Sequence, residues 1–351
     1  MKKTTAIGLA LLSAALFGAS TPAAKWLLNS LGPWLLAGLL YLGSGLGLST
    51  VIVARRVMRL NVEEAPLRLP DTPWLAGAVF FGGIVGPVLL MLGLAQTAAS
   101  TAALLLNLEG LATMGIAWVV FRENVDRRLL LGAFAILTGA MLLSWNGGAL
   151  GGVRLGSILV AGACVAWGVD NNLTRKISGA DPMQIAAVKG LVAGLVNVAI
   201  GLGGGTAPPA ASAFALAALV GFFGYGVSLI CFILALRHLG TARTGAYFST
   251  APFVGAILSV VLFGDHLTIW LGLAAALMAL GVWLHLTEQH SHEHVHETLE
   301  HEHAHVHDEH HQHDHGPDDP PDEPHSHRHR HRPLLHAHAH FPDLHHRHGH
   351  G

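Results

Sequence analysis

Apolar residues fill long, uninterrupted runs along the first four fifths of the chain, and short polar segments separate the runs. A helix needs about 20 apolar residues to cross the hydrocarbon core of a bilayer. The runs predict ten transmembrane helices, at residues 5–27, 33–53, 73–94, 98–120, 128–146, 155–173, 183–202, 213–235, 242–263 and 268–286. Strands of a membrane barrel would instead alternate in polarity. The pattern therefore predicts an all-α integral membrane protein.

The composition agrees, since 52% of the residues are hydrophobic and 12% are charged. Such a chain has too much apolar surface to stay disordered and is too apolar for an ordinary soluble domain. Its two cysteines, Cys164 and Cys231, both lie in apolar runs. We expect them to be inert core thiols rather than parts of a disulfide framework.

Lysine and arginine gather on one side of the predicted helices, which sets the orientation by the positive-inside rule. With the N-terminus inside, thirteen basic residues fall in inner segments, whereas one or two, Arg154 and Lys25, fall in outer ones. This bias predicts a bacterial inner (cytoplasmic) membrane protein with both termini in the cytoplasm. The basic start followed by an apolar run would also suit a cleaved signal peptide, but the internal repeat requires this segment as a helix.

The two halves of the chain resemble each other. Phe17-Gly18, followed six residues later by Lys25, recurs as Trp167-Gly168 followed by Arg175, and residues 92–101 align with 234–243. The repeats span residues 1–146 and 155–286, with five predicted helices each. Because five is odd, the second half enters the membrane upside down. Inverted repeats of this kind give many secondary transporters their inward-open and outward-open states.

These features resemble the drug/metabolite transporter superfamily, in its EamA branch. The resemblance covers about residues 5–286 and includes the endings Phe121-Arg122-Glu123 and Phe263-Gly264-Asp265 of the fourth and ninth helices. It implies transport of small solutes, more often export, through a central cavity, with the fifth and tenth helices peripheral. One departure is Glu109-Gly110, which stands where the ninth helix has Ala251-Pro252.

Glu109 is the clearest candidate for the site, because it falls near the middle of the run 98–120. A charge at the bilayer centre costs at least about 2.5–3.5 kcal/mol, so it calls for a function. A desolvated carboxyl could carry a proton or bind the solute. Thr113 shares its helix face. A structural, protonated glutamate is the alternative.

A second polar group ends the sixth predicted helix. Trp167, Asp170 and Thr174 share a face there, and Asn171 and Asn172 are adjacent. Such a cluster could bind an amine or hydroxyls. It could instead cap the helix or pair with Lys189, which could also extend to the membrane interface. The set of predicted substrate- or proton-binding residues is Glu109, Thr113, Asn107, Trp167, Asp170, Asn171, Lys189 and Tyr247.

Residues 288–351 differ from the rest, with 23 of the 26 histidines, 13 Asp or Glu and 4 Arg. Few are apolar and Pro is frequent, so we expect a disordered cytoplasmic tail. Histidine recurs at alternate positions, and imidazole binds Ni, Co, Zn and Cu. The predicted metal ligands are His290, His292, His294, His296, His301, His303, His305, His307, His325, His327, His329 and His331. Alternatively, protonation below about pH 6.5 would make the tail cationic and pH-responsive.

Three functions remain open from the sequence. The first is a secondary active transporter, an exporter of a small organic metabolite by alternating access. The second is an exporter of divalent metal ions loaded from the tail, and the third is a metal-responsive membrane sensor without transport. The sequence shows no phosphate-binding loop of the type Gly-x4-Gly-Lys-Ser/Thr and no nucleophile triad, so we expect neither an ATP-driven pump nor an enzyme. We expect no required cofactor and no nucleic-acid partner, and a homodimer is possible.

Overall fold

The protein is described by a computed structural model. It covers residues 3–58, 65–121, 127–145, 154–177, 180–206, 208–232, 234–235, 244, 247–287, 290–296, 300–305, 325–330 and 334–340. The helices of the first half are α1 (Lys3–Leu27), α2 (Pro33–Val57), η1 (Leu69–Asp71), α3 (Thr72–Ala78), η2 (Val79–Val85), α4 (Gly86–Ala95), α5 (Ala99–Leu105), α6 (Leu108–Phe121) and α7 (Arg127–Ser144). Those of the second half are α8 (Leu155–Thr174), η3 (Arg175–Ile177), α9 (Pro182–Gly203), α10 (Ala211–Gly221), η4 (Phe222–Val227), α12 (Ala251–Phe263) and α13 (Ile269–Leu286).

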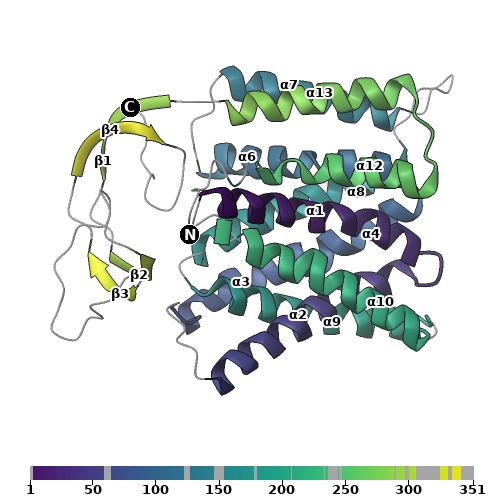
Figure 1. Ribbon diagram of the computed structural model, residues 1–351, viewed down its shortest axis with the longest axis horizontal. Helices are drawn as coiled ribbons and strands as arrows, with labels where there is room; N and C mark the ends of the chain where they lie inside the picture. The colour runs from purple at the N-terminus through teal and green to yellow at the C-terminus, as the bar shows by residue number, and fades with distance from the viewer. Residues whose placement is uncertain are drawn as a thin grey trace.

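The helices form a bundle whose axes run roughly side by side (Figure 1). Among the described residues, seven helical stretches are long and apolar enough to cross a membrane, and α12 and α13 are apolar but shorter. The outer face of α7 exposes Leu131, Phe134, Leu137 and Met141. An apolar surface of this kind suits contact with lipid. The chain is therefore an all-α integral membrane protein over this part.

The start of α1 and the end of α13 lie at the same end of the bundle (Figure 1). We call this the proximal end and the opposite one, where α1 ends and α2 begins, the distal end. By the distribution of basic residues, the proximal end is the predicted cytoplasmic end.

Glycines bring α2 and α9 together at what we call the glycine crossing. A Cβ added at Gly190 would lie 2.7 Å from Cα of Gly45, and one at Gly201 would lie 3.2 Å from Cα of Leu35. Higher residue numbers on one helix therefore meet lower ones on the other, so the two helices run antiparallel. They are the second helix of each half, and an antiparallel pair is what an inverted repeat requires of them.

A second pair of contacts follows the same symmetry. Gly18 of α1 packs on α12, where an added Cβ would lie 3.1 Å from Cβ of Val254. Its repeat counterpart, Gly168 of α8, packs on α6, where the distance to Cβ of Ala112 would be 2.8 Å. The Phe-Gly and Trp-Gly motifs thus place the first helix of each half against the fourth helix of the other.

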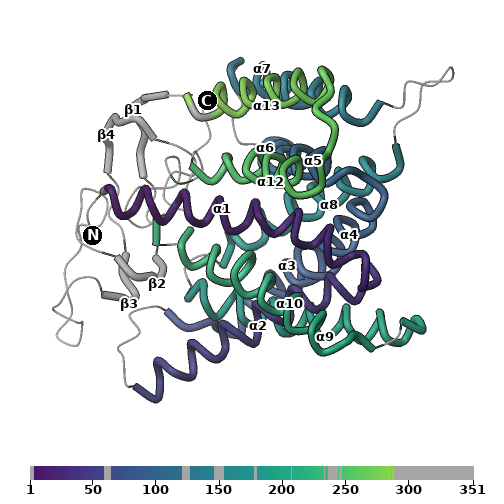
Figure 2. Tube along the Cα trace, turned by 45° about the vertical axis from the view of Figure 1, so that its right-hand side comes forward, coloured from purple at the N-terminus to yellow at the C-terminus, as the bar shows by residue number. Residues whose placement is uncertain are grey.

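The fifth and tenth helices, α7 and α13, lie side by side at one edge of the bundle (Figures 1 and 2). Gly139 of α7 faces Met278 and Ala274, with an added Cβ 3.0 Å from the Ala274 carbonyl oxygen. This peripheral position agrees with the expectation drawn from the family resemblance.

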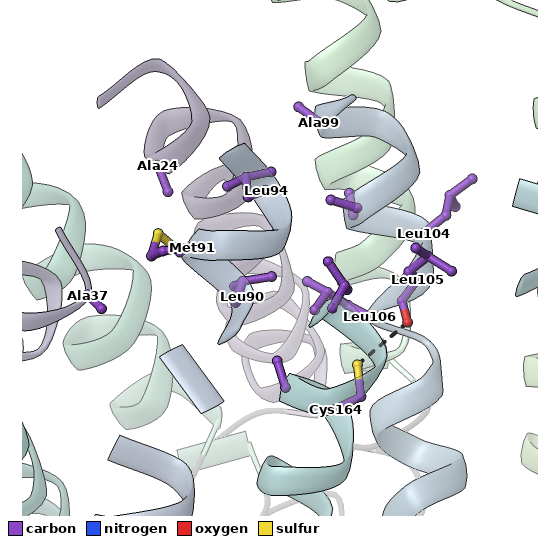
Figure 3. Packing of buried hydrophobic residues seen from close by; sticks show 14 of the residues in the cluster. Ala24, Ala37, Leu90, Met91, Leu94, Ala99, Leu104, Leu105, Leu106 and Cys164 are labelled. Carbon is purple, nitrogen blue, oxygen red and sulfur yellow. Dashed lines mark hydrogen bonds between the residues drawn. The ribbon is translucent and has the colours of Figure 1, made fainter. Parts of the chain in front are cut away.

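The buried core lies between α1, α2, α4, α5 and α8 (Figure 3). Met91, Leu94 and Leu105 are fully buried there. The thiol of Cys164 donates to the carbonyl oxygen of Leu105 at 3.6 Å. Both Cys164 and Cys231 are buried and free, which confirms that they are core thiols.

The structure describes part of the histidine-rich tail. Its described segments are four strands, β1 (His290–His296), β2 (Glu300–His305), β3 (His325–Arg330) and β4 (Leu334–His340). β1 pairs with β4 and β2 with β3, both antiparallel. Alternating histidines have the two-residue period of a strand, which is compatible with extended pairing despite the polar composition. The disorder predicted for residues 288–351 stays a prediction from the sequence.

Candidate functional site

Glu109 lies at a break in the fourth predicted helix. Here α5 ends at Leu105 and α6 begins at Leu108. The amide of Asn107 donates to the Leu104 carbonyl oxygen at 2.9 Å. This side-chain bond competes with helical pairing, and the backbone bonds of Leu106, Asn107 and Glu109 tighten to the residue three back. Glu109 therefore occupies the first turn of α6, where the positive end of the helix dipole favours a carboxylate.

The polar side chains of α8 hold Glu109 in place. Asn171 donates its amide to the Glu109 carboxylate at 3.0 Å and to the Thr113 hydroxyl at 3.1 Å. Asn172 donates to the Thr113 carbonyl oxygen at 3.1 Å and to that of Gly168 at 2.8 Å. The close approach of α6 to α8 at Gly168 makes these bonds possible. Glu109 and Thr113, which were predicted to share a helix face, are thus joined to Asn171 of the second predicted polar group.

Asp170 and Lys189 form an ion pair between α8 and α9. Asp170 is 4% exposed and also accepts a hydrogen bond from the Thr174 hydroxyl at 3.0 Å. The sequence left open whether Lys189 pairs with Asp170 or extends to the interface, and in the structure it pairs. Glu109 lies within electrostatic range of both members of the pair. The three charges therefore form one group, with one more negative charge than positive when all are ionised.

A π-helical turn, η2, supplies a backbone acceptor beside this group. The Gly86 amide donates to the Phe81 carbonyl, five residues back, so the Gly82 carbonyl loses its α-helical donor. The next candidate is residue 87, a proline without an N–H. The Gly82 oxygen instead accepts from the Tyr41 hydroxyl at 2.7 Å and from the Trp167 indole at 3.0 Å. Such single π turns are frequent at functional sites.

Aromatic rings extend from this carbonyl toward α1. The ring centroids of Tyr41 and Tyr225 are 5.5 Å apart, and those of Tyr225 and Phe17 are 5.7 Å apart. Tyr225 belongs to η4, the π-helical turn of the second half. We use the name polar cluster for seven residues. Five of them carry the charges and their hydrogen-bond partners, and two bind the Gly82 carbonyl: Glu109, Thr113, Asp170, Asn171 and Lys189, and then Tyr41 and Trp167.

Two predicted residues lie elsewhere. Asn107 is buried, and its amide faces Leu104 and the sulfur of Met278 on α13, at 3.9 Å from that sulfur. Tyr247 packs beside Ala6 and Ala10 of α1 and Ala235. The structure also places Tyr41 and Tyr225, which the sequence did not single out, at the cluster. The signal that could have found Tyr41 is the combination of Gly82 and Gly83 with Pro87, which predicts carbonyls without helical donors.

The described side chains include no group of three or more His, Cys, Asp or Glu that could hold a metal ion. The twelve predicted histidine ligands lie in the tail, whose side chains are outside the described part of the structure. Metal binding by the tail therefore stays a prediction from the sequence. The polar cluster contains a half-buried carboxylate, an ion pair, an amide and a phenol. The carboxylate can exchange a proton, and all of these groups can bind a polar solute.

Two stretches of the chain, residues 4–145 and 154–287, match the EamA-like transporter family. The chain belongs to that family. The matches lie close to the two repeats found in the sequence, and the resemblance to the drug/metabolite transporter superfamily is confirmed.

Among curated relatives, an "Uncharacterized transporter" of Methanothermobacter thermautotrophicus is 28% identical over 282 residues, covering 76% of this chain and 82% of the relative. "Uncharacterized transporter YyaM" of Bacillus subtilis is 22% identical over 243 residues, covering 63% and 75%. A solved structure described as "Crystal structure of protein" has a TM-score of 0.58 at 18% identity and covers 81% of this EamA-like chain and 96% of its own. This last likeness shows the fold alone.

Proposed function

We propose that this EamA-like protein is a secondary active transporter of a small organic metabolite, and specifically an exporter. The observation that carries the proposal is Glu109, a carboxylate at a helix break inside an apolar bundle, hydrogen-bonded to Asn171 of the other repeat. Transporter sites are commonly formed where broken helices of two repeats meet. A charge in such a place is expensive, so we assign it to binding or proton coupling.

The proposed arrangement is ten transmembrane helices in two inverted five-helix repeats. The antiparallel glycine crossing supports the inversion, and so does a second break. Residues 249–250 form a turn before α12, one repeat after the turn at residues 106–107. Exchange of the two repeats' conformations would expose the polar cluster first to the cytoplasm and then to the outside. We place both termini in the cytoplasm and the bundle in the inner membrane.

Glu109 is proposed to alternate between a proton and the solute. The solute would displace the Asn171 amide from the carboxylate, while Lys189 and Asp170 would orient its other polar groups. Protonation of Glu109 would then reset the empty carrier. This scheme requires that the carboxyl, rather than the shape of the side chain, is essential.

The test is Glu109→Gln in proteoliposomes that contain a pH-sensitive dye. We expect proton movement driven by a panel of amino acids, nucleosides and amines to fall by at least about 100-fold, a loss comparable to removing a general acid–base group. Expression and elution volume should be unchanged, because glutamine keeps the acceptor for Asn171. Thr138→Val, on the peripheral helix α7 and with its hydroxyl bonded to the Phe134 carbonyl oxygen of the same helix, is the control and should retain flux. Flux that persists in Glu109→Gln would exclude this residue from the site.

A second proposal concerns metal ions and rests on the alternating histidines of residues 290–307 and 325–340. The tail would bind Ni, Co, Zn or Cu in weak, exchangeable sites and either deliver the ion as cargo or sense it. A deletion strain should be grown under each metal with full-length protein or with residues 1–287. Rescue by the full chain alone would support metal export. Equal rescue of metabolite toxicity by both forms would support the organic solute.

A further inference from the structure

Lys25 binds the chain at the distal end instead of extending into water. It lies in the last turn of α1 and is partly buried. Its ammonium donates to the carbonyl oxygen of Leu94 at 2.6 Å and to that of Thr97 at 2.9 Å. These carbonyls belong to the end of α4 and the turn after it, where helical carbonyls lack backbone donors and carry partial negative charge. Lys25 therefore fixes the α4–α5 turn to α1.

Asp265 binds the same region from the other repeat. It lies between α12 and α13, and its carboxylate accepts from the backbone N–H of Ser100 at 3.0 Å and from the Ser100 hydroxyl at 2.7 Å. Ser100 is 2% exposed and is in the first turn of α5. The carboxylate thus caps a helix of the first repeat with a residue of the second. Lys25 lies within electrostatic range of Asp265.

The first turn of α8 adds a further contact between the repeats. A Cβ added at Gly156 would lie 3.1 Å from the Gly93 carbonyl oxygen and 3.2 Å from Cβ of Gln96. The α4–α5 turn is therefore held by α1 on one side and touched by two segments of the second repeat, the 264–268 segment and α8. At the distal end, the repeats are in contact.

We propose that Asp265, Ser100 and Lys25 form the distal gate of the carrier, closed in this structure. The proposal rests on the proposed function, because an alternating-access carrier opens by separating its repeats at one end at a time. Opening at the distal end would break both hydrogen bonds from Ser100 to Asp265. Lys25 stays with the first repeat and keeps the α4–α5 turn in the shape that Asp265 recognises. The gate is thus a helix cap made across the repeat boundary.

The test measures opening directly, without flux. Ser157 lies at the distal start of α8, is 2% exposed, and its hydroxyl has no partner among the described residues. In purified full-length protein carrying Ser157→Cys, the rate of maleimide labelling reports exposure of this position. Protein without Ser157→Cys gives the background from the buried Cys164 and Cys231.

Asp265→Ala should raise the labelling rate about tenfold, as expected when a charged helix cap worth roughly one decade of equilibrium constant is lost. Asp265→Asn keeps an acceptor and should label close to the parent rate. Thr268→Ala is the matched control. Its hydroxyl oxygen accepts from the Leu271 N–H at 3.1 Å, so it caps α13 in the same segment but within one repeat. It should leave labelling unchanged.

Unchanged labelling in Asp265→Ala, or an equal rise in Thr268→Ala, would overturn the gate. If Asp265→Ala does not yield folded protein, Ser100→Ala removes one of the two bonds and should give a smaller rise; no rise there would also refute the proposal. Failure of the transport proposal is distinguishable. If labelling responds as expected but the protein shows no solute-driven flux, the proposed gate stands and the proposed transport function fails. If flux is present but labelling does not respond to the substitutions, the transport function stands and the gate fails.

Discussion

The glycine crossing and the polar cluster share helix α9 but depend on different physical properties. At the crossing, the missing side chains of Gly45, Gly190 and Gly194 allow the backbones of α2 and α9 to touch. One residue from Gly190, Lys189 enters an ion pair that belongs to the cluster. The crossing joins equivalent helices of the two repeats, whereas the charged residues of the cluster are not repeated. Added side-chain volume should therefore destabilise the protein at the glycine crossing, and loss of a charge should destabilise it at the polar cluster.

The largest expected effect on stability comes from Lys189→Met, which leaves the Asp170 carboxylate buried without its cation. Breaking a buried pair by removing one partner costs about 3–5 kcal/mol. We expect the free energy of unfolding in detergent micelles, measured by chemical denaturation, to fall by about that amount. The double variant Asp170→Asn/Lys189→Met should recover most of the loss. A double variant as unstable as the single one would show that packing, rather than charge, is what matters at this pair.

A smaller effect is expected from Gly194→Ala at the crossing. The new Cβ would lie 2.6 Å from the Leu42 nitrogen and 2.8 Å from its Cα, so the helices must separate at a cost of about 1–3 kcal/mol. Gly203→Ala is the control in the same helix, with nothing within 4 Å of the added carbon. It should be neutral or stabilising by up to about 1 kcal/mol. The thermal unfolding temperature should therefore fall in Gly194→Ala but not in Gly203→Ala, and an equal fall in both would refute a volume-limited crossing.

The smallest effect is expected from Tyr41→Phe, because Tyr41 belongs to both regions. It lies on α2, and its hydroxyl reaches the Gly82 carbonyl, which keeps the Trp167 indole as a second donor. Loss of one hydrogen bond of this kind costs about 0.5–1.5 kcal/mol. Tyr247→Phe, outside the cluster, should stay within about 0.5 kcal/mol. If the denaturation curves of the two variants coincide, the Tyr41 hydroxyl contributes nothing measurable to the stability of the cluster.

The sequence predicted much of the helical bundle, since long apolar runs follow from lipid contact and repeated motifs follow from helix packing. Gly18 and Gly168 were recognised as equivalent and occupy equivalent contacts. Helical spacing placed Asp170 and Thr174 on one face, and they are hydrogen-bonded. The pairing of Lys189 required knowledge of which helix lies opposite, which the sequence left open.

The break in the fourth helix was not predicted, because residues 98–120 contain neither a proline nor a clear change in hydrophobicity. At the break, the Asn107 side chain donates to the Leu104 carbonyl oxygen, a bond that competes with helical pairing. The sequence counted Asn107 and Tyr247 as site residues from their chemistry alone. Tyr41 was missed for the opposite reason, since a lone tyrosine in an apolar run gives no sign of its partner.

The π-helical turns have a consequence for insertions and deletions. Each turn in η2 and η4 holds one residue more than an α-turn, and one residue of an α-helix corresponds to about 100° of rotation. A π turn accommodates its extra residue without turning the helix that follows, so deleting a single residue within Val79–Val85 would return the helix to its ordinary winding and leave Met91 and Leu94 facing the core. The same deletion inside a regular α-helix of this chain would turn every later side chain by about 100°, so these two turns should tolerate it better than the regular helices do.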